Sequence, residues 1–366
     1  MSSHGPFWIP LVVCLLLQLS RSSGWVIMNS VPSQSSASPT QFAAASPVEV
    51  LSIRGRKFLV KRDDKLRLLR SSVPGNKARK LHGLNAMSDE EFPDLVVSFG
   101  GPQSNAMIAL AAIVASKGSR LKYYTKKIPR WLSRNPSGNL ARALALQTEI
   151  IEVHPKDYAD VFGGPDGPLH PGASICPPGA YWIPQGGAAA GAEDGVKMLA
   201  DEIIDYWSTS ESEWPGKSLT VVVPSGTGTT ALFLARHLQP HGIEVVAIPC
   251  IGDDAYLRRQ MERLDRDANA KGVFPKILKP LKKEKFGAPR RELLEIWRAL
   301  RQAKLFVDLL YGARAWEVLL EPAALADLWG DEGRVCMYYH SGGLEGVSTQ
   351  LTRYKHTGLV DAKELQ

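Results

Sequence analysis

Short apolar runs alternate with longer amphipathic segments along the chain from about residue 50 onward. Apolar runs that end at glycine or at polar residues are typical of buried parallel strands. They predict strands at 94–99, 121–127, 149–153, 219–223, 243–250 and 334–340. The segments between them predict helices at 104–118, 135–148, 188–207, 229–238, 290–302 and 313–322. Because strands and helices alternate, we predict an α/β fold with doubly wound parallel sheets.

The length of the chain and one break in this alternation indicate two domains. A chain of 366 residues exceeds the size at which a single core usually stops growing. A Gly- and Pro-rich stretch at 163–179 also interrupts the pattern and marks a domain boundary or a surface loop. We predict a large domain formed by residues 49–85 and 181–366, with a small α/β domain, residues 86–180, inserted into it.

The first 48 residues differ in composition from the rest, because they contain no Asp, Glu or Lys and Arg21 is their only formal charge. The apolar run Phe7–Leu19 has the length of a signal-peptide core and is short for a membrane span. We predict a removable leader, residues 1–48, that directs the protein to a plastid or mitochondrion. A secretory address is the alternative, although no basic segment precedes the apolar run. We expect no membrane segment in the mature form.

The overall composition is that of an ordinary soluble protein, with 44% apolar and 22% charged residues and a net charge of +7. Basic clusters at 122–130 and 282–285 lack stacked aromatic residues, so we expect solvated surface and no nucleic-acid partner. The cysteines and histidines are scattered, which supports neither a disulfide framework nor a metal site. Cys250 and Cys336 lie in apolar runs and are expected to be buried thiols.

The most informative single stretch is Ser225–Thr230, Ser-Gly-Thr-Gly-Thr-Thr, which joins a buried strand to a helix. Its glycines let backbone N–H groups turn inward, its hydroxyls add donors, and the helix N-terminus adds partial positive charge. The stretch lacks the Gly-Lys-Ser/Thr ending of a P-loop and the spacing of a dinucleotide motif. It favours a single phosphate monoester, and an ordinary turn that caps a helix is the alternative.

A second strand–helix junction carries Gly100 and Gly101, followed by Gln103, Ser104 and Asn105. Three adjacent polar residues exceed what a helix cap requires. Ligands of open α/β sheets bind at this edge of the sheet. We therefore favour a ligand-binding role over capping alone.

Other polar turns lie at predicted strand ends, and each is more often structural than functional when taken alone. One is the Gly-rich segment 183–195, and two others place the hydroxyls of Tyr311 and Ser341 near turns. We interpret His340 as a hydrogen-bonded structural residue in preference to a catalytic base. The segment Gly75–Lys80 places three cations within four residues, and both a solvated corner and a chemical role are open for it.

Six segments of the chain occur together in one known family and in the same order. The segments are GNKARKL, SFGGPQSNAM, IPQGGAAAG, PSGTGTTA, VDLLYGARAWE and YYHSGGLEG. They resemble the D-cysteine desulfhydrase / 1-aminocyclopropane-1-carboxylate (ACC) deaminase family over about residues 48–355. Members of that family use pyridoxal 5′-phosphate (PLP) and have the two-domain tryptophan synthase β-like fold, called fold type II. The resemblance implies this fold, PLP as cofactor, a small amino-acid substrate and a homodimer.

The resemblance also implies the contacts of the cofactor. Lys77 matches its covalent anchor, with a pKa lowered by Arg79, Lys80 and partial burial, while Arg79 itself is expected to be a structural or surface cation. Lys80 matches the lysine that reaches the cofactor phosphate. The other implied contacts are Asn76 and Asn105 near the phenolic oxygen, Gly226, Thr227, Gly228, Thr229 and Thr230 around the phosphate, and Ser341 at the ring nitrogen.

Ser104 matches the catalytic serine of the family, with Gln103 and Asn105 beside it to hold the substrate carboxylate. Tyr311 matches the active-site tyrosine. Two positions depart from the family pattern, because Phe286 replaces a second tyrosine and Ala106 replaces a histidine. These departures bear on the substrate and leave the implied cofactor contacts intact.

A third departure favours one reaction over another. Gly312 stands where ACC deaminases carry a glutamate that pairs with the pyridine nitrogen. The hydroxyl of Ser341 is a weaker partner for that nitrogen, which suits the loss of a good leaving group such as a thiolate. We predict β-elimination from D-cysteine to pyruvate, ammonia and hydrogen sulfide. ACC deamination to 2-oxobutanoate and ammonia is the alternative, and a non-catalytic protein that binds a phosphate ligand is a third possibility.

Overall fold

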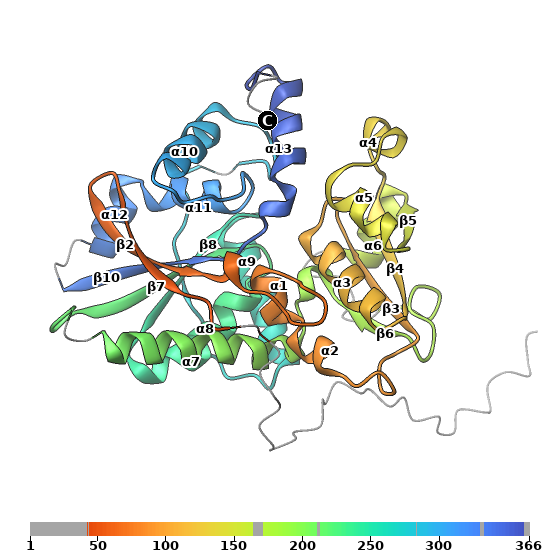
Figure 1. Ribbon diagram of the computed structural model, residues 1–366, viewed down its shortest axis with the longest axis horizontal. Helices are drawn as coiled ribbons and strands as arrows, with labels where there is room; N and C mark the ends of the chain where they lie inside the picture. The colour runs from red at the N-terminus through yellow and green to blue at the C-terminus, as the bar shows by residue number, and fades with distance from the viewer. Residues whose placement is uncertain are drawn as a thin grey trace, which may run out of the picture. The chain divides into compact units, whose positions relative to one another are not determined.

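The computed structural model describes residues 42, 44–163, 171–210, 213–282, 284–329 and 333–361. These residues form two β-sheets, each flanked by helices (Figure 1). The α/β fold with parallel sheets is therefore confirmed. Most of the predicted leader, up to residue 41, lies outside the described residues.

The larger sheet has six strands in the order β1-β2-β10-β7-β8-β9. Strand β1 pairs with β2 in antiparallel fashion, and all other neighbours are parallel. The hairpin of β1 and β2 was not predicted, because the outer strand is half exposed and lacks a continuous apolar run. The strands are β1 (Val48–Ile53), β2 (Arg56–Arg62), β7 (Ser218–Ser225), β8 (Glu244–Pro249), β9 (Lys276–Ile277) and β10 (Arg334–His340).

Both faces of this sheet are buried, which explains why its central strands are continuous apolar runs. Successive side chains of a strand point to opposite faces. Val221 and Val223 belong to one core, whereas Val222 between them belongs to the other. Helices α7 (Glu193–Thr209), α8 (Thr229–Leu238) and α9 (Asp254–Asp267) pack into the first core. The second core contains side chains of α10 (Arg291–Gln302), α11 (Gly312–Leu319), α12 (Pro322–Trp329) and α13 (Val347–His356).

The smaller sheet has four parallel strands in the order β5-β4-β3-β6. These are β3 (Leu95–Gly100), β4 (Arg120–Lys126), β5 (Glu149–Val153) and β6 (Tyr181–Ile183). Its helices are α2 (His82–Ala86), α3 (Asn105–Ser116), α4 (Arg130–Arg134), α5 (Gly138–Ala145) and α6 (Pro155–Phe162). Because β6 pairs with β3, this sheet extends three residues beyond the predicted domain boundary at residue 180.

The packed part of the chain begins before the predicted end of the leader at residue 48. Phe42 is buried and forms an isolated bridge with Leu68, and Ser46 is buried beside Asp63. These contacts close over α1 (Gly75–Lys80), the short helix formed by the cluster of cations.

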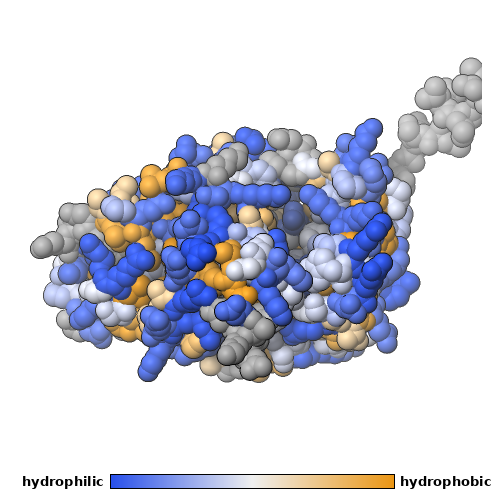
Figure 2. Space-filling model, turned by 90° about the horizontal axis from the view of Figure 1, so that it is seen from above, coloured by the Kyte–Doolittle hydropathy of each residue, from blue (hydrophilic) through white to orange (hydrophobic). Residues whose placement is uncertain are grey.

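Three smaller expectations can be compared with the described residues. Cys250 and Cys336 are buried, as expected from their apolar neighbours. Within the described ranges, no helix combines the length and the apolar character needed to cross a bilayer. The face seen in Figure 2 is mostly hydrophilic, with smaller hydrophobic areas between the charged side chains.

Candidate active site

A cavity of about 1240 Å³ lies at the carboxyl ends of the parallel strands, and both sheets contribute to its lining. The loops that follow β3, β7 and β10 all reach it, as expected for ligand sites in open α/β sheets. Every site residue predicted from the sequence lines this one cavity: Asn76, Lys77, Lys80, Gln103, Ser104, Asn105, Gly226, Thr227, Gly228, Thr229, Thr230, Tyr311 and Ser341. Segments far apart in sequence therefore meet at one place.

Lys77 is held by a close backbone contact between α1 and the turn that follows β10. The Asn76 N–H donates to the carbonyl of Ser341 at 2.9 Å. Gly75 has a φ of +65°, and a side chain there would lie 2.5 Å from the same carbonyl oxygen. Only glycine permits this approach. The Lys77 ammonium then lies 3.0 Å from Asn76 Oδ1, at the cavity wall beside Ser341.

Burial lowers the pKa of Lys77 to about 8, and the nearby carboxylate of Asp308 opposes this shift. Desolvation disfavours the charged amine. A neutral amine is the form that attacks a carbonyl group, so the environment prepares Lys77 for covalent chemistry.

Arg79 does not contribute to this shift in the way the sequence predicts. Its guanidinium is fully buried and pairs with Asp63 at 3.1 Å and Glu202 at 2.7 Å. These two carboxylates compensate the charge of Arg79, so it does not act on Lys77. Arg79 is a structural cation, which is one of the two roles expected for it.

The predicted phosphate cradle is formed where β7 passes into α8. Gly228 has a φ of +74°, and a side chain there would collide with Met261 at 2.4 Å. The hydroxyls of Thr227 and Thr229 lie 2.8 Å apart. The Lys80 ammonium lies 3.4 Å from the hydroxyl of Thr227.

An anion would satisfy this group of atoms. Burial, together with the charge of Lys77, lowers the pKa of Lys80 well below its ordinary value. Among the described residues no carboxylate pairs with Lys80, and the buried hydroxyl of Thr230 has no hydrogen-bond partner. A phosphate group would favour the charged ammonium and accept from the hydroxyls. The residues of the cradle therefore fit a phosphate monoester.

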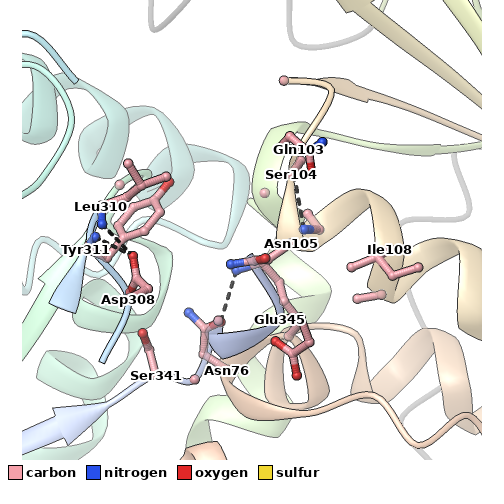
Figure 3. Close-up of a pocket in the computed structure, with 18 of the residues that line it drawn as sticks. Asn76, Gln103, Ser104, Asn105, Ile108, Asp308, Leu310, Tyr311, Ser341 and Glu345 are labelled. Carbon is pink, nitrogen blue, oxygen red and sulfur yellow. Dashed lines mark hydrogen bonds between the residues drawn. The ribbon is translucent and has the colours of Figure 1, made fainter. Parts of the chain in front are cut away.

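The opposite wall of the cavity comes from the loop between β3 and α3, where Gln103, Ser104 and Asn105 lie together (Figure 3). Ser104 is the N-cap of α3 and accepts from the backbone N–H groups of residues 106 and 107 at 3.1 and 3.4 Å. Both interpretations of this serine are thus compatible, because a capping hydroxyl also lines the cavity. The amide of Gln103 is bonded to Ser137 and Asn139, so a role in substrate binding stays a prediction.

Tyr311 and Asp308 lie across the cavity from Ser104 (Figure 3). The Tyr311 ring would contact a side chain at Gly226, and its centroid lies 5.6 Å from that of the Phe286 ring, with the two ring planes tilted by 60°. Asp308 is buried, and its two oxygens accept from the backbone N–H groups of residues 310, 311 and 312 at 2.8, 2.8 and 3.0 Å. This carboxylate fixes the turn that carries Tyr311.

Glu345, Gln350 and Arg353 line the cavity although they were not predicted from the sequence, and so does the buried Asp308. Its signal was an acidic residue directly after the apolar segment Leu305–Val307. Gly312, by contrast, is not part of the lining, because a side chain there would meet the Cβ of Val307 at 2.5 Å. A side chain at position 312 would therefore point into the core.

His340 is buried and hydrogen-bonded, as its sequence context suggests. Its Nδ1 accepts from the Gly342 N–H at 3.2 Å, and Nε2 contacts the carbonyl of Phe306. A carbonyl can only accept, so Nε2 carries the proton. The imidazole thus holds the turn on which Ser341 lies.

Comparison with known proteins shows the fold. No known family model and no curated protein sequence matches the chain. The solved structures include an ACC deaminase homologue, which is 20% identical over 87% of this chain and 94% of its own, with a TM-score of 0.67. A fungal L-serine ammonia-lyase from Rhizomucor miehei is 13% identical over 85% of this chain and 98% of its own, with a TM-score of 0.54. A pyridoxal 5′-phosphate-dependent aspartate racemase is 12% identical over 82% of this chain and 90% of its own, with a TM-score of 0.50.

The chain has the fold of the type II PLP enzymes. This confirms the fold class predicted from the sequence and agrees with the family resemblance of its six segments. At these identities the comparison establishes the architecture, and the chemistry has to be inferred from the residues of the cavity.

Proposed function

We propose that this protein is a PLP-dependent lyase that converts D-cysteine to pyruvate, ammonia and hydrogen sulfide. One observation carries the proposal: a buried lysine with a pKa of about 8, Lys77, lines the same cavity as the phosphate cradle. A reactive amine and a phosphate site within one cavity are the two features needed to hold PLP. The fold neighbours and the sequence resemblance support the same cofactor.

The described residues fit the cofactor at both of its ends. Lys80 and the hydroxyls of the cradle would hold the phosphate, and Lys77 would bind the carbonyl carbon. Asn76 and Asn105 would contact the phenolic oxygen, and Ser341 would face the ring nitrogen. When bound, PLP accepts the electron pair released at the substrate Cα.

Side chains of the protein would transfer the proton, bind the substrate carboxylate and close the cavity. We propose that the amine of Lys77 holds the proton removed from the substrate Cα. The N-terminus of α3, with Ser104, offers donors to the substrate carboxylate. Tyr311, held by Asp308, closes the other side of the cavity.

The geometry around Gly312 supports D-cysteine over ACC. Residue 312 is a glycine, and a side chain there would meet Val307, so a carboxylate at this position could not reach the cavity. The hydroxyl of Ser341 lies on the cavity wall. A neutral ring nitrogen gives a weaker electron sink, which is adequate when a thiolate leaves. Deamination of ACC is the second candidate, and the TM-score of 0.67 to an ACC deaminase homologue favours it.

The test is turnover of D-cysteine, L-cysteine and ACC, measured side by side on the purified protein loaded with PLP. We expect a yellow protein that releases sulfide from D-cysteine, and we expect Lys77→Ala to abolish both properties. The matched control Lys57→Ala changes an exposed lysine of β2 and should retain both. A colourless protein after incubation with PLP would refute the cofactor. Production of 2-oxobutanoate from ACC, without release of sulfide from D-cysteine, would make ACC deamination the favoured function.

We also propose a homodimer and a plastid or mitochondrial location after removal of the leader. The family resemblance supports the first proposal, and the acid-free composition of residues 1–48 supports the second. Light scattering of the purified protein and microscopy of a fluorescent fusion would test them.

A further inference from the structure

Three side-chain amides are linked by hydrogen bonds beside the active-site cavity, and one of them was not singled out by the sequence. Asn139, the second residue of α5, is completely buried. Its backbone N–H donates to Gln103 Oε1 at 2.9 Å. Its side-chain Nδ2 donates to the Gln103 carbonyl at 3.2 Å and to Asn105 Oδ1 at 2.8 Å. We call Gln103, Asn105 and Asn139 the amide relay.

Backbone groups fix the direction of every hydrogen bond in the amide relay. A carbonyl oxygen only accepts, so the Asn139 atom that faces the Gln103 carbonyl must be the nitrogen. The atom of Asn105 that faces this nitrogen must then be its oxygen. The Gln103 amide is fixed in the same way, because its nitrogen meets the carbonyl of Ser137 at 2.8 Å. The orientation of Asn105 therefore follows from the chemistry and not from a choice between similar atoms.

The free end of the Asn105 amide is consequently a donor. Its Nδ2 lies on the side of the β10 turn, 2.8 Å from where a side chain on Gly343 would begin. Gly343 follows the turn of Ser341 and has a φ of +86°. An N–H group directed to this wall of the cavity matches an anionic oxygen and repels a cation.

The side chain of Asn139 also includes a buried polar atom that lowers the stability of the fold. Its own Oδ1 is buried and has no hydrogen-bond partner among the described residues. An unsatisfied buried acceptor destabilises a protein, so the contribution of this side chain lies in the two hydrogen bonds that it donates. Only an amide at this position supplies both donors at once.

We propose that Asn139 is a positioning residue that makes Asn105 present its N–H group, and not its carbonyl, to an anionic oxygen of the bound cofactor or substrate. This inference rests on the proposed function for the identity of the ligand. The polarity of the amide relay does not depend on that function and can be tested without any ligand.

The first test measures melting temperatures of the protein without added PLP. Asn105→Asp keeps an oxygen facing Asn139, so its melting temperature should stay within about 2 °C of the unchanged protein. Asn139→Asp removes both donors and should lower the melting temperature by more than about 4 °C. The control Asn135→Asp introduces the same charge at an exposed position shortly before α5 and should have no effect. The reverse order of the two effects would overturn the assigned polarity.

The second test measures the dissociation constant of PLP by fluorescence titration. Asn139→Asp accepts from Asn105 and turns its carbonyl toward the cavity, so PLP affinity should fall about tenfold, the value of one hydrogen bond to a charged group. Asn105→Ala should show a similar loss. In the double variant, Asn139→Asp should change the affinity of the Asn105→Ala protein less than about twofold. Additive losses would show that Asn139 acts by a route other than Asn105 and would refute the proposal.

If no variant binds PLP and the unchanged protein also fails to bind it, the proposed function fails while the melting test still decides the polarity. If the unchanged protein binds PLP and Asn139→Asp binds it equally well in a folded state, the positioning role is refuted while the proposed function stands.

Discussion

The carboxylate of Asp308 should control how much of the Lys77 amine is neutral near pH 7. Burial sets the pKa of Lys77 at about 8, and Asp308 is the charge that opposes this shift. At this pKa about one tenth of the amine is neutral at pH 7. The variant Asp308→Asn removes the opposing charge, and loss of one nearby charge lowers a pKa by about one unit or more. About half of the amine would then be neutral at pH 7, an increase of about fivefold.

The sign of the effect follows from the charges. A carboxylate stabilises the ammonium form, so its removal must lower the pKa of Lys77 and make the amine more reactive at a given pH. The same substitution affects stability, because the Gly312 N–H loses its acceptor at Asp308 Oδ2. This loss should cost about 1–3 kcal/mol of unfolding free energy. The variant therefore has to be checked for folding by circular dichroism before its pKa is measured.

The assay needs no cofactor. Trace acetic anhydride labels only neutral amines, and mass spectrometry of the Lys77 peptide across pH 6–11 gives a midpoint for this single residue. We expect a midpoint near pH 8 in the unchanged protein and a lower one in Asp308→Asn. The control Asp327→Asn removes an exposed carboxylate that pairs with Lys276, away from the lining of the cavity, and should leave the midpoint unchanged. A midpoint above pH 10 in the unchanged protein, or an upward shift in Asp308→Asn, would refute the reasoning.

Three further predictions concern affinity and stability. Lys80→Met removes the ammonium that faces the phosphate cradle and should weaken PLP binding by at least about tenfold in an equilibrium titration. Arg79→Met leaves the fully buried carboxylate of Asp63 without its guanidinium partner and should cost about 3–5 kcal/mol in urea unfolding. Arg70→Met, at an exposed ion pair with Asp89, should cost much less. Gly228→Ala combines a positive φ with a collision and should destabilise more than Gly216→Ala, where φ is also positive but the space is open. Equal effects in either matched pair would contradict the corresponding structural argument.

Several parts of the fold and site could be predicted from local sequence because their causes are local. A strand buried on both faces is apolar at most positions, and the run Leu219–Val223, in which Thr220 is the one polar residue, shows it. A phosphate cradle needs glycines and hydroxyls between a strand and a helix, and Ser225–Thr230 supplies both. The motifs in chain order then led to Lys77 and to the fold type II architecture that the solved structures share.

Other features depended on contacts between distant segments. The continuation of the small sheet beyond residue 180 was not predicted, because β6 is only three residues long and is defined by its pairing with β3. Asp308 carries no local motif, and its position in the cavity follows from the turn that its carboxylate holds.

Arg79, Gly312 and Asn139 show most clearly which features follow from local sequence and which depend on packing. The helices, the strands and the reactive residue types could be predicted from local sequence, because hydrophobic period and turn chemistry are properties of neighbouring residues. Tertiary structure decided that Arg79 is neutralised by Asp63, that Gly312 faces the core, and that Asn139 orients Asn105. Burial, charge pairing and hydrogen-bond direction arise only when residues that are far apart in the chain are packed together.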